Sequence, residues 1–202
     1  MYLNPDLLEA HQRYKLLIGS VIPRPIAFVS TMGKDGVRNV APYSFFNVVC
    51  FNPMILAFFP IRYKKGDEIK DTVRNIQETG EYCINVSTEE LASQITIASG
   101  LYDYEKDEFD LTGLTPVESK MIKPPGVGES PIRFECVLDR MIRFGDDAGG
   151  SDGIFGKVVS MYIDDALMDD FKIDELKLNP IARLAGNKFS TLGKIFEIER
   201  PS

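Results

Sequence analysis

The sequence is poor in the residues that most often carry catalysis or bind transition metals. It has one histidine, His11, and three cysteines, Cys50, Cys83 and Cys136, which lie far apart and form no C-x-x-C pair. A Cys/His metal site is usually signalled by ligands at short, fixed spacings, and a cysteine nucleophile needs a histidine as its base. Without a G-x-S-x-G motif, a serine hydrolase has no candidate either. We therefore expect buried, reduced thiols in a reducing compartment, and no metal site.

Long apolar runs and an excess of positive charge are also missing. No run is long enough to cross a bilayer, and residues 1–17 are charged throughout, so we expect a cytoplasmic protein with no membrane association. The net charge of −7 repels phosphate backbones, which argues against nucleic acid as a partner. A bound anion would need a local source of positive charge, such as a few cations or a helix N-terminus. The absence of G-x-G-x-x-G after a strand does not support a dinucleotide-binding Rossmann fold.

The composition indicates one globular domain over residues 1–202, since 44% of the residues are apolar and 26% charged. Apolar runs separated by turn residues predict β-segments at 25–31, 37–44, 45–50, 54–60, 82–87, 132–144 and 154–164. Fewer helices are expected: one capped by Asp71 or Thr72 and ended by Gly80, one opened by a Ser87/Glu90 capping box, and part of 101–114. This order predicts an α+β protein, mainly β, built on a barrel or sandwich with a few inserted helices.

A cluster of polar residues interrupts the apolar strands between residues 30 and 47. Ser30, Thr31, Asn39, Ser44 and Asn47 stand among Phe, Val and Ile, and a buried hydroxyl or amide must find a partner. That partner could be a flat ligand with a polar edge, or the strands' own backbone groups.

Pro42 lies within the same stretch. It has no backbone N–H, so we expect its strand to lie at a sheet edge or a bend.

Two further segments have a composition that invites comparison with ion-binding sites. Lys70-Asp71-Thr72 at a helix start suits a single phosphate, with an ordinary helix cap as the alternative. The 61–69 segment before it reads as a basic loop containing a glycine. The acidic residues of 145–153 lack the spacing of a calcium loop, so a hairpin loop is expected there.

Taken together, these segments resemble the flavin reductase-like family with an FMN-binding split barrel, to which nitrilotriacetate monooxygenase reductase components and flavoredoxin belong. RPIAFVST (24–31), G-x-x-N-V-A-P-Y-S-F-F-N (36–47) and KDTVRNIQETGEYCINV (70–86) carry the resemblance most specifically. Weaker matches continue to NPIARLAGNKFSTLG (179–193), so that the resemblance covers roughly residues 12–193.

The resemblance implies a Greek-key split barrel, a homodimer, and FMN near the subunit interface. By position, the flavin contacts would come from Ser30, Thr31, Asn39, Ala41, Pro42, Tyr43, Ser44 and Phe45, the phosphate contacts from Lys70 and Thr72, and a further contact from Arg183. In one departure, relatives can carry a lysine just before the phenylalanine of the DEF segment, where this chain has Glu108. A histidine that some relatives place near residue 150 is also absent.

The resemblance further implies an NAD(P)H-dependent flavin oxidoreductase, in which the cofactor performs the chemistry that the side chains do not offer. Hydride would pass from NADH or NADPH to flavin, and electrons would go on to a monooxygenase partner, an iron centre or oxygen. The alternative is an FMN-binding electron carrier or flavin-binding module that uses no pyridine nucleotide. The choice of nucleotide, the final acceptor and whether FMN is prosthetic or exchangeable stay open at this point.

Overall fold

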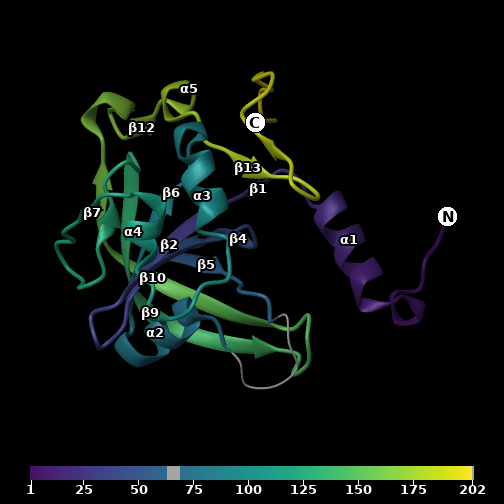
Figure 1. Cartoon of the computed structure of the whole chain (residues 1–202). Coiled ribbons are helices and arrows are strands. Elements are labelled where there is room, and N and C mark those ends of the chain that lie inside the picture. The colour runs from purple at the N-terminus through teal and green to yellow at the C-terminus, as the bar shows by residue number, and fades with distance from the viewer. Residues whose placement is uncertain (63–68, 202) are drawn as a thin grey trace.

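The computed structural model describes residues 1–62 and 69–201. Its centre is an antiparallel sheet of seven strands (Figure 1), namely β2 (Ala27–Met32), β3 (Arg38–Tyr43), β4 (Phe46–Phe51), β5 (Met54–Phe58), β6 (Glu81–Val86), β9 (Ile132–Phe144) and β10 (Ser151–Ile163). Their order across the sheet is β3-β2-β6-β9-β10-β5-β4. The predicted β-segments thus all form strands of one sheet, and the expectation of a mainly β protein is confirmed.

The remaining elements are short. The helices are η1 (Pro5–Leu7), α1 (Ala10–Ser20), α2 (Asp71–Thr79), η2 (Glu89–Leu91), α3 (Ala92–Ile97), α4 (Glu108–Thr112), η3 (Asp165–Leu167) and α5 (Glu175–Leu178). Three small sheets pair β1 (Arg24–Pro25), β13 (Ala182–Arg183) and β14 (Phe189–Ser190); β7 (Pro116–Val117) and β8 (Gly126–Val127); and β11 (Met168–Asp169) and β12 (Lys172–Ile173).

The two edge strands of the large sheet, β3 and β4, are consecutive in the chain. Only Ser44 and Phe45 separate them, so the edges of the curved sheet meet at this corner. Pro42 lies on edge strand β3, opposite Phe28 of β2, as its missing N–H predicts. The corner is therefore the place where the main chain leaves the hydrogen-bonded ladder.

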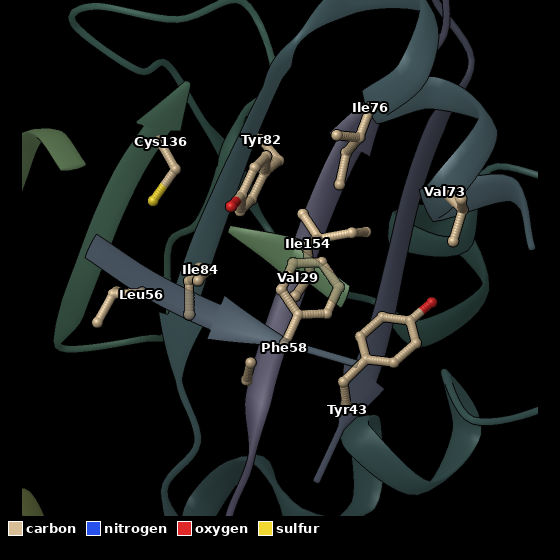
Figure 2. Packing of buried hydrophobic residues seen from close by; sticks show 11 residues of the cluster. Val29, Tyr43, Leu56, Phe58, Val73, Ile76, Tyr82, Ile84, Cys136 and Ile154 are labelled. Atoms are coloured by element: carbon tan, nitrogen blue, oxygen red, sulfur yellow. The ribbon is translucent and has the colours of Figure 1, made fainter. Parts of the chain in front are cut away.

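Strand β2 separates two hydrophobic clusters because successive side chains point to opposite faces. Val29 faces the interior of the sheet's curve, where Phe58, Tyr82 and Ile154 also pack (Figure 2). Helix α2 closes this interior with Val73 and Ile76, which lie three residues apart on one helix face. On the other face, Phe28 packs with residues that include Leu91, Ile95 and Phe109 from the η2, α3 and α4 segments.

Two predicted helix caps are wrong. Helix α2 begins at Asp71, and its N-cap is Lys70, whose side chain makes no capping hydrogen bond. The predicted end is correct, since Gly80 adopts the left-handed conformation with φ 73°. Ser87 does not cap the next helix either. Its hydroxyl instead donates to the carbonyl of Ile26, because the residue is buried beside β2.

The predicted hairpin of β9 and β10 is confirmed, and its loop is shorter than 145–153 because β10 begins at Ser151. Arg62 ties this hairpin to the end of β5. Its Nη1 lies 2.5 Å from Oδ1 of Asp152, and its Nη2 donates to the carbonyls of Phe144 and Gly145. Residues 63–68 of the predicted 61–69 loop lie outside the described residues.

Helix α1 and the C-terminal end of the chain extend away from the large sheet (Figure 1). No residue of α1 is buried, and residues 191–201 have no regular secondary structure. His11 lies in α1, in the stretch that reads as helix in the sequence. Within the described part of the chain, no helix is long and apolar enough to span a membrane.

Candidate functional site

Three predicted site residues meet in a buried polar network beside the start of α2. Thr31 of β2 and Asn39 of β3 are opposite one another in the sheet. Oδ1 of Asn39 accepts hydrogen bonds from the hydroxyls of Thr72, at 2.6 Å, and Thr31, at 3.3 Å. Asn75 of α2 adds a bond from its Nδ2 to Oγ1 of Thr31, at 3.1 Å. The network therefore fastens the first two turns of α2 to the edge of the sheet.

Glu108 of α4 completes this network and is 6% exposed. One of its oxygens, Oε2, accepts from Nδ2 of Asn39 at 2.5 Å and from the backbone N–H of Val40 at 2.7 Å. Asp107 holds α4 in place, because it caps the helix at the N–H of Phe109 and pairs with Arg38 of β3 at 2.5 Å. The carboxyl group is thus fixed on the outer edge of β3.

The surroundings of Glu108 change its acidity. Burial raises its pKa to about 7, the nearby charge of Asp71 acts in the same direction, and the Val40 N–H and Lys70 oppose the rise. Burial also lowers the pKa of Lys70, against the attraction of Asp71 and Glu108. Near neutral pH the carboxyl group of Glu108 is therefore close to half protonated.

The N-terminus of α2 combines groups that favour an anion with an acidic side chain in the first turn. Helix N–H groups and the helix dipole favour an anion there, and Lys70 adds a positive charge. Asp71 stands in the first turn, but its carboxylate pairs with Arg74 at 2.6 Å. Thr72 is 1% exposed, and its hydroxyl proton is donated to Asn39 rather than to solvent.

The segment from Ala41 to Phe45 leads from this network to the corner between β3 and β4. Tyr43 points inward against the ring of Phe58, with the ring centroids 5.0 Å apart (Figure 2). Ala41 and Pro42 are half-buried on the strand. Ser44 and Phe45, just after it, are half-buried as well and form the corner itself.

A second group of residues surrounds this corner and centres on Arg24. Its guanidinium group donates to the carbonyls of Ile18, Val21 and Leu184, lies 3.5 Å from Oγ of Ser44, and stands over the ring of Phe45 at 5.9 Å. Burial lowers the pKa of Arg24, and the neighbouring charge of Arg183 acts in the same direction.

Arg183 lies beside Arg24 because β13 pairs with β1. Its backbone lies opposite Arg24, while its guanidinium group donates to the carbonyl of Gly186 and stacks on Phe189 at 4.5 Å. Arg24 therefore contacts Ser44 and Phe45, and Arg183 is its neighbour across the strand pair.

Ser30 does not join either group. It points to the opposite face of β2 from Thr31, where its hydroxyl donates to the carbonyl of Pro125 at 2.6 Å and accepts from Asn85 at 3.1 Å. The structure thus brings Thr31, Asn39 and Thr72 together and places Ser44, Phe45 and Arg183 around Arg24. It leaves the side chain of Ser30 bound to Pro125 and Asn85, apart from both groups.

Sequence reasoning missed Arg24 and the contacts of Glu108. Arg24 precedes a proline in an apolar stretch, and its partners come from residues 18, 21 and 184, so no local spacing marks it. Glu108 was noticed only as the position where relatives can carry a lysine. Its burial follows from the packing of α4 on β3, which the residue order alone does not show.

We identify no candidate site for cysteine or metal chemistry among residues 1–62 and 69–201. Cys83 and Cys136 are buried free thiols, as expected, and Cys50 is partly exposed. Burial raises the pKa of Cys83 to about 12, so its thiolate is not available at neutral pH. In the same ranges, no group of three or more His, Cys, Asp or Glu residues could hold a metal ion.

Comparison with known proteins agrees with this fold. Residues 18–173 match the family model described as flavin reductase like domain. Among solved structures, nitrilotriacetate monooxygenase component B from Bacillus cereus is 40% identical, with a TM-score of 0.93 and 98% of each chain covered.

Two further structures share the fold. The 2-nitrobenzoate 2-nitroreductase NbaA from Pseudomonas fluorescens is 27% identical, with a TM-score of 0.87 over 100% of this chain and 96% of that one. A protein with a split barrel domain from Shewanella frigidimarina is 23% identical, with a TM-score of 0.84 over 100% of both chains. The predicted split-barrel fold is therefore confirmed.

Proposed function

We propose, starting from the fact that the chain belongs to the flavin reductase like domain family, that it binds FMN along β3 and transfers hydride from NADH or NADPH to flavin. The observation that supports this most is the presence of polar groups at both ends of β3, namely the network around Asn39 at the start of α2 and the corner where Ser44 meets Arg24. A phosphate and a polar-edged ring need donors at two separated places, and the two ends of β3 offer both.

The donors at α2 fit a phosphate group. Lys70 and the N–H groups of the first helical turn would hold it, because a lysine at the N-cap has no acceptor atom with which to occupy those N–H groups. Thr72 would contribute indirectly, because its hydroxyl donates to Asn39 and so holds the start of α2 in position. Asp71 does not oppose the anion with its full charge, since Arg74 pairs with it.

The donors at the corner fit the polar edge of the ring. Alternate residues of an antiparallel strand turn their backbone groups away from the partner strand, and Val40 does so toward Glu108. Pro42 has the same orientation but no N–H, so Ser44 is the next residue able to donate outward. Together with Arg24 and Arg183, its N–H would stabilise negative charge that develops on a ring bound there. Bound FMN would itself supply the hydride-accepting chemistry.

Anaerobic mixing of FMN-loaded protein with NADH or NADPH tests the proposal. Loss of the flavin's visible absorbance with either nucleotide supports hydride transfer. If FMN binds but neither nucleotide bleaches it, the protein is an electron carrier or a flavin-binding module instead. If FMN does not bind at any concentration tested, the cofactor assignment itself is wrong.

A matched pair of variants tests the site at α2. Thr72→Val removes the hydroxyl that links α2 to Asn39, and we expect it to weaken FMN binding about tenfold or more, the effect of losing one buried hydrogen bond at 1–3 kcal/mol. Thr96→Val removes the hydroxyl of an exposed residue in α3 that bonds only within its own helix, and should leave binding unchanged.

Two similar proteins suggest candidate electron acceptors. The similarity to a monooxygenase component B makes a partner monooxygenase one acceptor, and the nitroreductase makes a nitroaromatic compound another. Steady-state oxidation of NADH or NADPH with each acceptor in turn distinguishes these uses.

We further propose that the protein works as a homodimer joined through α1. This helix has 11 residues and none is buried, and a helix of that length is marginal without packing. Its exposed apolar side chains include Tyr14, Leu16 and Leu17. Arg24 holds the end of α1 through Ile18 and Val21 and also touches Ser44, so a partner seated on α1 would lie beside the corner.

A further inference from the structure

We propose that Glu108 is a specificity-determining residue for the flavin: its ionised carboxylate opposes the phosphate of FMN, and the residue takes up one proton from solvent when FMN binds. The inference rests on the proposed FMN site. It adds that the protonation of Glu108 controls how well this site binds the phosphate.

The position of Glu108 connects it directly to the phosphate end of the site. The chain of hydrogen bonds runs from Oε2 of Glu108 through the amide of Asn39 to the hydroxyl of Thr72, the second residue of α2. Within the described residues, the carboxyl group of Glu108 accepts two hydrogen bonds, both on Oε2 and both from neutral donors. These bonds persist when the other oxygen carries a proton, so the network does not have to rearrange on protonation.

The charges around Glu108 explain why a phosphate would favour its neutral form. Lys70 and Asp71 face it from α2, and Asp107 faces it from its own helix. Arg38 of β3 is already paired with Asp107 and Asp110. Lys70 interacts with both Asp71 and Glu108, and an incoming phosphate would compete with these carboxylates for it.

Protonating Glu108 removes one of these competitors at small cost, since its pKa already lies at about 7. Lys70 can then serve the phosphate. Because FMN binding favours the protonated form, the affinity must fall as pH rises above 7, by up to about tenfold per pH unit for one linked proton. Riboflavin has the same ring without the phosphate, so its binding should show no such linkage.

Titration calorimetry at pH 8, in two buffers of different ionisation enthalpy, measures the protons taken up. We expect about one proton per FMN for the wild type and close to none for riboflavin. Glu108→Gln mimics the protonated carboxyl and keeps an oxygen that can accept from Asn39 and Val40. This variant should take up almost no proton and should bind FMN about ten- to a hundredfold more tightly than the wild type at pH 9.

Equal proton uptake for FMN and riboflavin, or an equal pH slope in wild type and Glu108→Gln, would overturn the inference. The comparison of the two flavins uses the wild type alone, so it stands even if the variant does not fold. Weaker FMN binding by Glu108→Gln at pH 9 would also overturn it, since it would show that the carboxylate helps to hold the site. Absence of FMN binding at every pH would instead contradict the proposed function.

Discussion

Among single residues, the buried carboxyl of Glu108 couples the stability of the fold itself to pH. Its pKa in the folded protein, about 7, lies above the ordinary value of 4.5 that a glutamate has in an unfolded chain. The folded state therefore holds this proton at pH values where the unfolded chain has lost it. The stability that results is fully present below pH 4.5 and is lost as pH rises toward and through 7.

We accordingly predict a difference between wild type and Glu108→Gln in the pH dependence of unfolding. Between pH 5 and pH 8 the wild type should lose on the order of 2–3 kcal/mol that the variant keeps, from a shift of about two and a half pH units. Urea unfolding at several pH values, followed by circular dichroism, measures this. Parallel curves for the two proteins would show that the carboxyl is neutral or ionised in both states alike.

Gly156 of β10 gives a second prediction about a single residue. A methyl group at this position would meet the hydroxyl oxygen of Tyr82 at 1.8 Å, and Tyr82 is fully buried. Gly156→Ala should therefore destabilise the protein by about 1–3 kcal/mol, the usual cost of overpacking. The Tyr82 hydroxyl has no hydrogen-bond partner within the described residues, so Tyr82→Phe alone should cost little.

The double variant Gly156→Ala/Tyr82→Phe provides the control. It removes the closest of the clashing atoms, and we expect it to recover part of the lost stability in a thermal or urea unfolding experiment. Ring carbon Cζ of Tyr82 would still lie 2.6 Å from the added methyl group, so recovery should be incomplete. Simple addition of the two single effects would contradict this reading.

At the level of elements, the β9–β10 hairpin depends on a buried ion pair. Arg62 and Asp152 are 2.5 Å apart, and their side chains are 4% and 10% exposed. Asp152→Ala leaves the guanidinium group buried without its counter-ion, and we predict a loss of about 3–5 kcal/mol. Chemical unfolding measures the change.

Asp146 at the tip of the same hairpin serves as the matched control. It pairs with Arg143 at 3.4 Å while 93% exposed, and such surface pairs contribute at most about 1 kcal/mol. Asp146→Ala should therefore leave stability nearly unchanged. Similar losses in the two variants would mean that the hairpin is held by its backbone ladder and not by the buried pair.

The elements also show what sequence could and could not predict. Strands, the β9–β10 hairpin and the edge position of β3 follow from local signals, namely apolar runs, turn glycines and the missing N–H of Pro42. The caps failed because tertiary contacts took the capping side chains: Thr72 donates to Asn39 and Ser87 to Ile26. Arg24 could not be found for the same reason, since its partners are distant in the chain.

For the whole molecule, the exposed apolar side chains of α1 predict the assembly state. We expect a dimer in size-exclusion chromatography with light scattering. Leu17→Asp places a charge on the 58%-exposed α1 residue and should shift the protein toward monomer. Leu101→Asp changes an 87%-exposed leucine in a loop and should leave the dimer intact. A monomeric wild type would refute the assembly through α1.

The outer edge of β3 has a consequence for how copies of this chain can meet. An exposed sheet edge is a template on which strands from other molecules can add, which is a common route to aggregation. Here Glu108 occupies the outward N–H of Val40, and Pro42 offers none, so an added strand would find no donors at these two positions. The same carboxyl that faces the start of α2 therefore also protects the folded protein against fibre-like growth along β3.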